Sequence, residues 1–348
     1  MKVGLLDGPG RLALADRPAP LAGDGELVVR MAACGVCGTD LEKLRGHYQS
    51  AGRIGHEPVG TVASVGAHVD GYREGDRVFV HHHVPCLTCA VCRRGDYTFC
   101  PSYARSNIDP GGFAESFRVP RENVARGAAL HLDPQVDWAT GTLIEPAACA
   151  LTALRRVGFH AGDAVFVVGL GPVGLLYARV AHALGARWVG GAELSPLRRA
   201  VGVAGGMNAV VDPRETGAAE QAVRTATGGD GVDLSVVATG SPVAVGLGAT
   251  LVRRGGTLNL FGLPDAGSRL EADLQDLYLR GIRVVPTYAT TERDIADVHA
   301  LLVGRRLDLS GIVTHQVPLE QIEEAFRLAQ APDTAVKVAV TGPAFRSG

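Results

Sequence analysis

The sequence predicts an α/β protein with two domains: a barrel-like β domain and a doubly wound parallel sheet flanked by helices. Its 348 residues exceed what one hydrophobic core usually supports, and they suit two domains. Up to about residue 135, short apolar segments stand between Gly, Pro and Asp, which is typical of closely spaced β-strands. From Asp163 onward, apolar segments alternate with stretches of helical spacing, and this pattern indicates a parallel sheet.

The first domain, residues 1–150, is expected to hold short strands that a polar lobe at residues 85–101 interrupts. These strands are Leu27–Met31, Gly60–Val65, Arg77–Val80 and Phe113–Val119. A helix over Ala139–Val157 then leads out of the domain, because its apolar residues recur at helical spacing.

The second domain, residues 151–288, is expected to alternate strands with helices. Its strands are Ala164–Val168, Trp188–Ala192, Asp233–Ala238, Thr257–Phe261 and an edge strand at Ile282–Val285, and two of its helices are Gly174–Leu184 and Pro196–Gly205. The last segment, residues 289–348, predicts helices at Glu292–Leu302 and Leu319–Ala329 and a strand at Val336–Val340. We expect this segment to return to the first domain.

The composition is that of an ordinary globular protein, with 46% hydrophobic and 20% charged residues. The formal net charge of -2 gives no electrostatic reason to expect nucleic acid or a membrane as a partner. The N-terminal residues lack the unbroken apolar core of a signal peptide, and the seven cysteines are an odd number in a large chain. Both observations favour a reducing, cytoplasmic location.

Four cysteines lie close together in the polar lobe, separated by two, two and seven residues. They are Cys86, Cys89, Cys92 and Cys100. This spacing lets one compact lobe present four thiolates tetrahedrally to zinc, which leaves no coordination position for a substrate. The sequence therefore predicts a structural zinc ion here, in preference to a pair of disulfides.

A glycine-rich turn, Gly169-Leu-Gly-Pro-Val-Gly174, lies between an expected strand and an expected helix. Such a turn places backbone N–H groups and a helix N-terminus at the pyrophosphate of a dinucleotide. In it, Gly169 permits the tight turn, Gly171 lets the backbone approach the phosphates, and Gly174 lets the helix pack closely on the strand. Pro172 and Val173 complete this predicted cofactor-binding segment.

An acidic residue, Glu193, ends the next strand, nineteen positions after Gly174. A carboxylate there accepts hydrogen bonds from both ribose hydroxyls and repels a 2′-phosphate, so NAD is favoured over NADP. Arg198 and Arg199 follow closely; either arginine would pair with a 2′-phosphate, or both are solvated helix charges.

Taken together, the motifs resemble those of the zinc-dependent medium-chain dehydrogenase/reductase superfamily, in its sorbitol and threonine dehydrogenase branch. The resemblance runs in order through Gly35–Asp40, Gly55–Gly60, the cysteine lobe, Gly112–Glu115, Glu145–Pro146 and the Gly169 turn. It implies a GroES-like catalytic domain, a Rossmann domain inserted before the C-terminal return, and two zinc ions per chain.

The resemblance also implies the chemistry. Cys37, His56, Glu57 and Glu145 would surround a catalytic zinc, with one glutamate reaching the metal through water as an alternative. The metal lowers the pKa of a substrate hydroxyl, Thr39 takes its proton, and hydride passes to the nicotinamide. Asp40 would support a ligand, through the His56 ring. Thr239 and Lys337 are assigned to the cofactor, Lys337 at the pyrophosphate. Alternatively, Glu145 is only a helix N-terminal charge.

The sequence departs from this family where a histidine often ends the proton relay, because Glu42 stands at that position. Glu42 relays protons, faces the substrate, or is a surface charge; our hypothesis places it at the substrate mouth. His47 and Tyr48 lie in the following loop as further candidates for the substrate pocket.

Other residues suggest metal binding or reactivity, but packing explains them better. His81, His82 and His83 follow a strand at the edge of a lobe whose cysteines already satisfy zinc, so hydrogen bonding is favoured over metal binding. Cys34 and Cys149 are interpreted as small buried residues.

An enzyme acting on a secondary alcohol of a polyol, sugar or cyclitol, including amino-substituted ones, is the favoured function. L-threonine or another amino alcohol is an alternative substrate, and a noncatalytic zinc- and nucleotide-binding protein is an alternative class. A zinc protein that binds nucleic acid is disfavoured, because 34 basic residues face 36 acidic ones. The family implies a homodimer or homotetramer that pairs the edges of its Rossmann sheets near Ile282–Val285.

Overall fold

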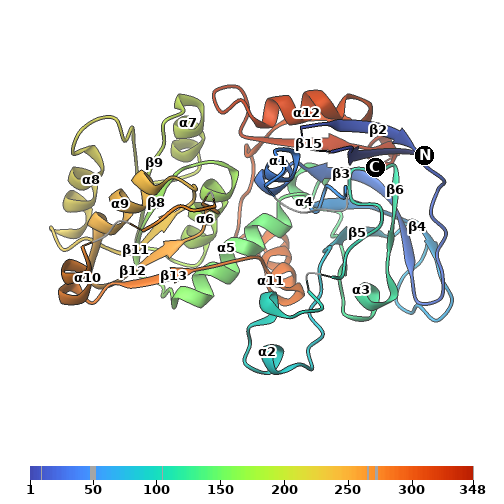
Figure 1. Ribbon diagram of the computed structural model, residues 1–348, viewed down its shortest axis with the longest axis horizontal. Helices are drawn as coiled ribbons and strands as arrows, with labels where there is room; N and C mark the ends of the chain where they lie inside the picture. Colours follow the sequence, from blue (N-terminus) through green and yellow to red (C-terminus); the bar gives the residue numbers. More distant parts are fainter. Residues whose placement is uncertain (9, 48–51, 104, 265, 271–272, 348) are drawn as a thin grey trace.

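The computed structural model describes residues 1–8, 10–47, 52–103, 105–264, 266–270 and 273–347. It contains a seven-stranded mixed sheet, a six-stranded parallel sheet and a two-stranded ribbon, β1 (Lys2–Leu6) and β2 (Leu12–Asp16). Figure 1 shows the two large sheets in separate lobes, with two helices between them. No helix in the described part of the chain is both long enough and apolar enough to cross a bilayer.

The mixed sheet has the order β14-β15-β3-β4-β5-β7, and β6 pairs with β3. Its strands are β3 (Leu27–Gly35), β4 (Pro58–Val65), β5 (Arg77–Val80), β6 (Ser116–Val119), β7 (Ala129–His131), β14 (Val313–Pro318) and β15 (Lys337–Thr341). Its short helices are α1 (Gly38–Leu44), α2 (Ala90–Arg93), α3 (Arg121–Ala125), α4 (Trp138–Gly141) and α12 (Ile322–Ala329), with 3-10 turns at Tyr97–Phe99, Leu319–Gln321 and Pro343–Ser347. Strand β15 runs antiparallel to β3, so the C-terminal segment completes the first sheet.

The parallel sheet has the order β10-β9-β8-β11-β12-β13, which is that of a doubly wound dinucleotide-binding fold. Its strands are β8 (Ala164–Val168), β9 (Trp188–Ala192), β10 (Ala209–Val211), β11 (Val232–Val237), β12 (Val252–Leu260) and β13 (Arg283–Pro286). Its helices are α6 (Pro172–Ala183), α7 (Pro196–Ala204), α8 (Ala218–Thr227), α9 (Pro242–Leu251) and α10 (Leu274–Arg280). The strand order reverses between β8 and β11, which is where such sheets bind their ligands.

Most expected elements occur with ends shifted by a few residues, and the larger differences have local causes. The helix expected over 139–157 is two helices, α4 and α5 (Ile144–Val157). The strand expected from residue 113 begins at Ser116, and β12 begins at Val252, five residues before the expected start. The domain limit placed at residue 150 falls inside α5, because this helix packs against elements of both domains.

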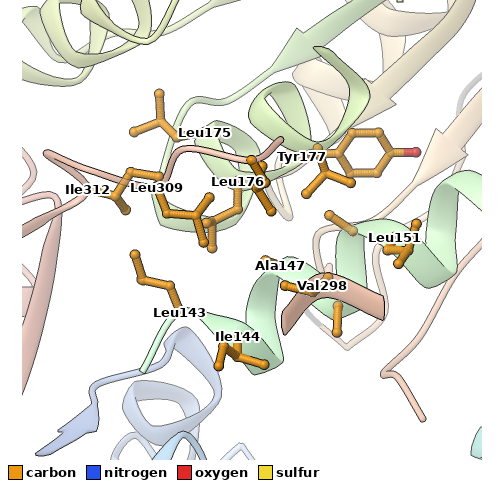
Figure 2. Packing of buried hydrophobic residues seen from close by; sticks show 14 of the residues in the cluster. Leu143, Ile144, Ala147, Leu151, Leu175, Leu176, Tyr177, Val298, Leu309 and Ile312 are labelled. Carbon is orange, nitrogen blue, oxygen red and sulfur yellow. The ribbon is translucent and has the colours of Figure 1, made fainter. Parts of the chain in front are cut away.

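Helix α5 forms much of the main hydrophobic core. It packs against α6 on one side and α11 (Glu292–Val303) on the other. Figure 2 shows the apolar side chains of these three helices converging, together with residues from the segment before β14. The labelled members include Ile144, Leu151, Leu176, Val298 and Ile312. The helix ends at Gly158, whose φ of 73° is left-handed and suits glycine. This shared core holds the two sheets in one arrangement.

Truncation of Leu151 tests this packing. The side chain is 2% exposed, so Leu151→Ala should lower the free energy of unfolding by about 2–5 kcal/mol. The matched control, Leu21→Ala, removes a leucine that is 85% exposed and should change that free energy by at most about 0.5 kcal/mol. Urea denaturation followed by circular dichroism measures both; equal losses in the two variants would contradict the assigned core.

Candidate metal centre and dinucleotide site

The segment after β3 presents Cys37 as the N-cap residue of α1. Three residues further on, Asp40 accepts a hydrogen bond at 3.2 Å from the Cys37 backbone N–H through its Oδ2 atom. This reciprocal capping arrangement fixes the start of the helix and the direction of the cysteine. The Sγ atom of Cys37 lies 3.8 Å from the hydroxyl of Thr39.

The same buried carboxylate positions the segment that carries His56. Oδ1 of Asp40 accepts a hydrogen bond at 3.0 Å from the Gly55 backbone N–H, and it lies 3.4 Å from Nδ1 of His56. Burial lowers the pKa of His56, but Asp40 and Cys37 together raise it well above its ordinary value. Because Nδ1 faces Asp40, the Nε2 atom of His56 is left for a metal, as is common for histidine ligands.

Glu57 is completely buried and forms an ion pair with Lys337, which is 2% exposed. The ammonium donates a hydrogen bond to Oε1 at 2.7 Å and lies 2.6 Å from Oε2. Burial raises the pKa of Glu57, and Lys337 partly offsets this rise. Gly35 makes the close approach feasible, since a Cβ atom there would lie 1.9 Å from Oε2 of Glu57. The structure thus gives Lys337 a partner other than the expected pyrophosphate, because a buried ammonium requires a nearby negative charge.

Cys37, His56 and Glu57 form one candidate metal centre, in which one ligand atom of each lies within 4.8 Å of the others. A thiolate, an imidazole and a carboxylate are the donors that zinc takes at open sites. Oε2 of Glu57 is sealed from solvent and accepts no hydrogen bond, so a donor atom is still available. These residues fit a zinc ion.

Glu145, in the first turn of α5, is buried but does not belong to this tight group. Its Oε1 atom accepts a hydrogen bond at 3.3 Å from Cys149. Its charge nevertheless raises the pKa of both Glu57 and Lys337, so it faces the cluster. The arrangement is consistent with the alternative in which one glutamate reaches the metal through water.

Glu42 and His47, the candidates for the substrate pocket, are paired with each other. Oε2 of Glu42 lies 2.6 Å from Nδ1 of His47, and Oε1 accepts a hydrogen bond at 2.6 Å from Arg45. Glu42 is half-buried and His47 is exposed. Both carboxylate oxygens of Glu42 are therefore engaged within the chain; Tyr48 lies outside the described residues.

The three consecutive histidines are not part of either metal group found among the described residues. Nδ1 of His81 lies 2.8 Å from Oε1 of Glu292, and Nδ1 of His83 contacts the Ser106 carbonyl oxygen. Burial lowers the pKa of His82 well below its ordinary value and that of His83 to about 3. The interpretation of His81 and His83 as hydrogen-bonded residues matches the structure.

The four lobe cysteines converge around α2, which projects away from the first sheet (Figure 1). Sulfur–sulfur distances of 3.6 and 3.9 Å separate Cys89 from Cys92 and from Cys100, and 3.9 Å separates Cys86 from Cys92. A tetrahedral zinc with Zn–S bonds of about 2.3 Å requires sulfur atoms about 3.8 Å apart. The side chain of Thr88 donates to Cys86 and lowers the pKa of that thiol to about 5. The lobe therefore fits a zinc ion, and none of these cysteines is in a disulfide.

The glycine-rich turn connects β8 to α6 at the switch point of the parallel sheet. Gly169 has a φ of 92°, and a Cβ atom at Gly174 would lie 2.0 Å from the Gly169 carbonyl oxygen. Around Gly171, by contrast, the one neighbour within 4 Å of an added Cβ is Arg198, at 3.7 Å. Thr239, which follows β11, lies against Gly169. Backbone N–H groups at Gly171 can therefore approach a phosphate closely.

Glu193 connects this turn to the end of β9. Its two carboxylate oxygens accept hydrogen bonds from the backbone N–H groups of Leu170, at 2.7 Å, and Ser195, at 2.9 Å. Each oxygen retains a second lone pair for a ribose hydroxyl. Arg198 is half-buried beside the turn, and its Nε atom has no hydrogen-bond partner among the described residues. Burial lowers the pKa of Arg198, and the charge of Glu193 opposes that change.

Sequence reasoning missed the Glu57–Lys337 pair and the distinct position of His82. The two members of the pair are 280 residues apart, so no local motif signals their contact. The His tract was visible, but nothing in its pattern separates the three rings.

Comparison with known proteins gives the same picture. Residues 23–129 match the alcohol dehydrogenase GroES-like domain, and residues 172–304 match the zinc-binding dehydrogenase family. Sorbitol dehydrogenase of Bacillus subtilis (strain 168) is 30% identical over 364 residues, covering 98% of this chain and 97% of that protein. L-threonine 3-dehydrogenase of Pyrococcus abyssi is 32% identical over 333 residues, covering 92% of each.

A solved structure from Sinorhizobium meliloti 1021 with bound NADP has a TM-score of 0.89 and 26% identity, covering 98% of both chains. Its agreement extends over the β domain and the parallel sheet together. The chain belongs to the zinc-dependent medium-chain dehydrogenase/reductase superfamily, in its sorbitol and threonine dehydrogenase-like branch.

Proposed function

We propose that the protein oxidises a secondary alcohol of a polyol, sugar or cyclitol with NAD as the hydride acceptor. The observation that carries this proposal is the buried group of Cys37, His56 and Glu57, whose donors suit an open zinc site. The named relatives act as zinc-family alcohol and polyol dehydrogenases, which supports the same reaction class. When bound, zinc supplies a Lewis acid for the substrate hydroxyl, and the nicotinamide supplies the hydride acceptor.

The chain's own residues have separate tasks in this proposal. Asp40 holds the ligands Cys37 and His56 in direction, since it bonds both of their segments. Lys337 keeps Glu57 ionised in a buried position. The Thr39 hydroxyl, on the helix that starts at Cys37, receives the proton of the substrate hydroxyl.

NAD is proposed over NADP because Glu193 places a negative charge where a 2′-phosphate would lie. Arg198 stands beside the turn, where it suits the pyrophosphate. In this arrangement the arginine does not reverse the preference. The solved relative with bound NADP makes the choice worth measuring directly.

L-threonine is a second candidate substrate, since a threonine dehydrogenase is 32% identical over almost the whole chain. Polyols are ranked above it because Glu42, not histidine, follows Cys37 in α1, and its carboxylate is occupied by Arg45 and His47. A noncatalytic role is disfavoured, because a protein without activity has no physical need for a buried group of zinc ligands.

A panel of polyols, sugars, amino alcohols and simple secondary alcohols tests the reaction. With zinc present, at least one polyol should reduce NAD at 340 nm, and its kcat/KM with NAD should exceed that with NADP by tenfold or more. Cys37→Ser should abolish the activity. If no alcohol reduced either cofactor, the noncatalytic alternative would replace this proposal, and a tenfold preference for NADP would overturn the role given to Glu193.

Metal analysis tests the two zinc sites separately. The purified chain should contain two zinc ions, and both Cys37→Ser and Cys92→Ser should lower the content to one. Only Cys92→Ser should make the 85–101 lobe sensitive to limited proteolysis, because the lobe has few apolar contacts without its metal. Two zinc ions retained in Cys92→Ser would contradict the structural site.

We also propose a homo-oligomer and a cytoplasmic location. Strand β13 is the edge of the parallel sheet, and next to it α10 exposes Leu274 and Tyr278, 78% and 84% accessible. Exposed apolar residues beside a free edge suit pairing with a second copy. The lobe thiols are unpaired, which suits a reducing compartment.

Light scattering after size exclusion tests the oligomer. The native chain should have two or four times the mass of one chain, and the double variant Leu274→Lys/Tyr278→Lys should shift toward the monomer. Leu21→Lys, which alters a distant exposed leucine, serves as the control. A native monomer would refute this surface.

A further inference from the structure

His82 differs from both of its neighbours in having no hydrogen-bond partner among the residues that the structure describes. Its Nδ1 atom is sealed from solvent and unpaired. His81 and His83, in contrast, contact Glu292 and the Ser106 carbonyl through their own Nδ1 atoms. Buried polar atoms are rarely left without a partner, and such exceptions mark functional positions.

The His82 ring lies directly beside the candidate metal centre. Its centroid is 5.0 Å from that of His56, and the ring of His83 packs against its other side at 3.9 Å. The carbonyl oxygen of His82 accepts a hydrogen bond at 2.9 Å from Asn123 in α3. The ring is therefore held in place from both sides and through its backbone.

The sealed Nδ1 atom determines which nitrogen carries the proton. A buried N–H without an acceptor costs more than a buried lone pair without a donor, so Nδ1 is the unprotonated nitrogen of the neutral ring. The proton then resides on Nε2. The residue is partly exposed, and Nε2 is not among the sealed atoms, so this N–H is open to a ligand.

We propose that His82 is a specificity-determining residue that donates its Nε2–H to an oxygen atom on the carbon next to the reacting carbinol. This inference rests on the proposed function and names its substrate class. The ligand chemistry is an oxygen acceptor, supplied by a vicinal hydroxyl or by a carboxylate. A neighbouring ammonium group, which can only donate, is disfavoured. The site thus favours vicinal diols and polyols over simple alcohols and amino alcohols.

A role in packing alone makes a different prediction. An apolar ring of similar size would then serve equally well and would affect all alcohols alike. A hydrogen bond to a second oxygen changes only the discrimination between substrates that have this oxygen and those that lack it.

The test compares 2,3-butanediol with 2-butanol, which share one carbon skeleton. In the zinc-loaded enzyme, kcat/KM should favour the diol, and His82→Phe and His82→Asn should lower that ratio about 10- to 100-fold. His82→Gln, whose amide N–H reaches the position of Nε2, should retain most of the ratio. Activity on 2-butanol should stay within about threefold, and the exposed control His160→Asn should change nothing.

Two further substrates identify the recognised group. Lactate should be accepted with the diol if a carboxylate oxygen serves, and rejected if only a hydroxyl does; 3-amino-2-butanol should behave like 2-butanol or worse. A preference for the amino alcohol that His82→Phe abolishes would overturn the proposal. Equal losses on diol and 2-butanol in His82→Phe would do the same.

A binding measurement separates this inference from the proposed function. Calorimetric titration of the zinc-loaded protein with NADH present should give a lower Kd for 2,3-butanediol than for 2-butanol, and His82→Phe should remove the difference. Zinc content and thermal midpoint identify any variant that loses its metal. Wild-type protein that oxidises no alcohol defeats the proposed function, whereas an unchanged Kd ratio in His82→Phe defeats the role of His82 even if the enzyme is active.

Discussion

The candidate active site depends on one buried carboxylate that holds two separate segments together. Asp40 bonds the backbone N–H of Cys37 through one oxygen and that of Gly55 through the other, and it lies against the His56 ring. Without it, the thiolate and imidazole would stand on independent loops at the end of β3 and the start of β4. Backbone hydrogen bonds to a charged group are stronger than neutral ones, so this one residue sets the geometry on which metal binding rests.

A second constraint connects the end of the chain to the same place. The Glu57–Lys337 pair is buried, and such pairs seldom stabilise a fold more than apolar residues of the same volume would. Its retention is better explained by the site, because it brings β15 against the ligand cluster and keeps a carboxylate ionised in a dry position. The C-terminal strand thus belongs physically to the centre that the first sixty residues begin.

The shared core around α5 relates the metal centre to the dinucleotide turn. Glu145 at the start of this helix faces the metal cluster, while the apolar face beyond it packs on α6, the helix that follows the turn. A single rigid element therefore spans both halves of the proposed reaction. Specificity lies in a smaller feature, the ring of His82, which is fixed in position but lacks a hydrogen-bond partner.

Local pattern by itself determined a large part of this protein. The cysteine spacing, the glycine turn followed by an acidic residue, and the apolar periodicity each act over a few residues, so they predicted the zinc lobe, the cofactor turn and most strands. Contacts between distant segments were decided only by the tertiary structure. It paired Lys337 with Glu57, engaged Glu42 with its own neighbours and left His82 alone among three histidines, because partners and burial depend on residues that are remote in the sequence.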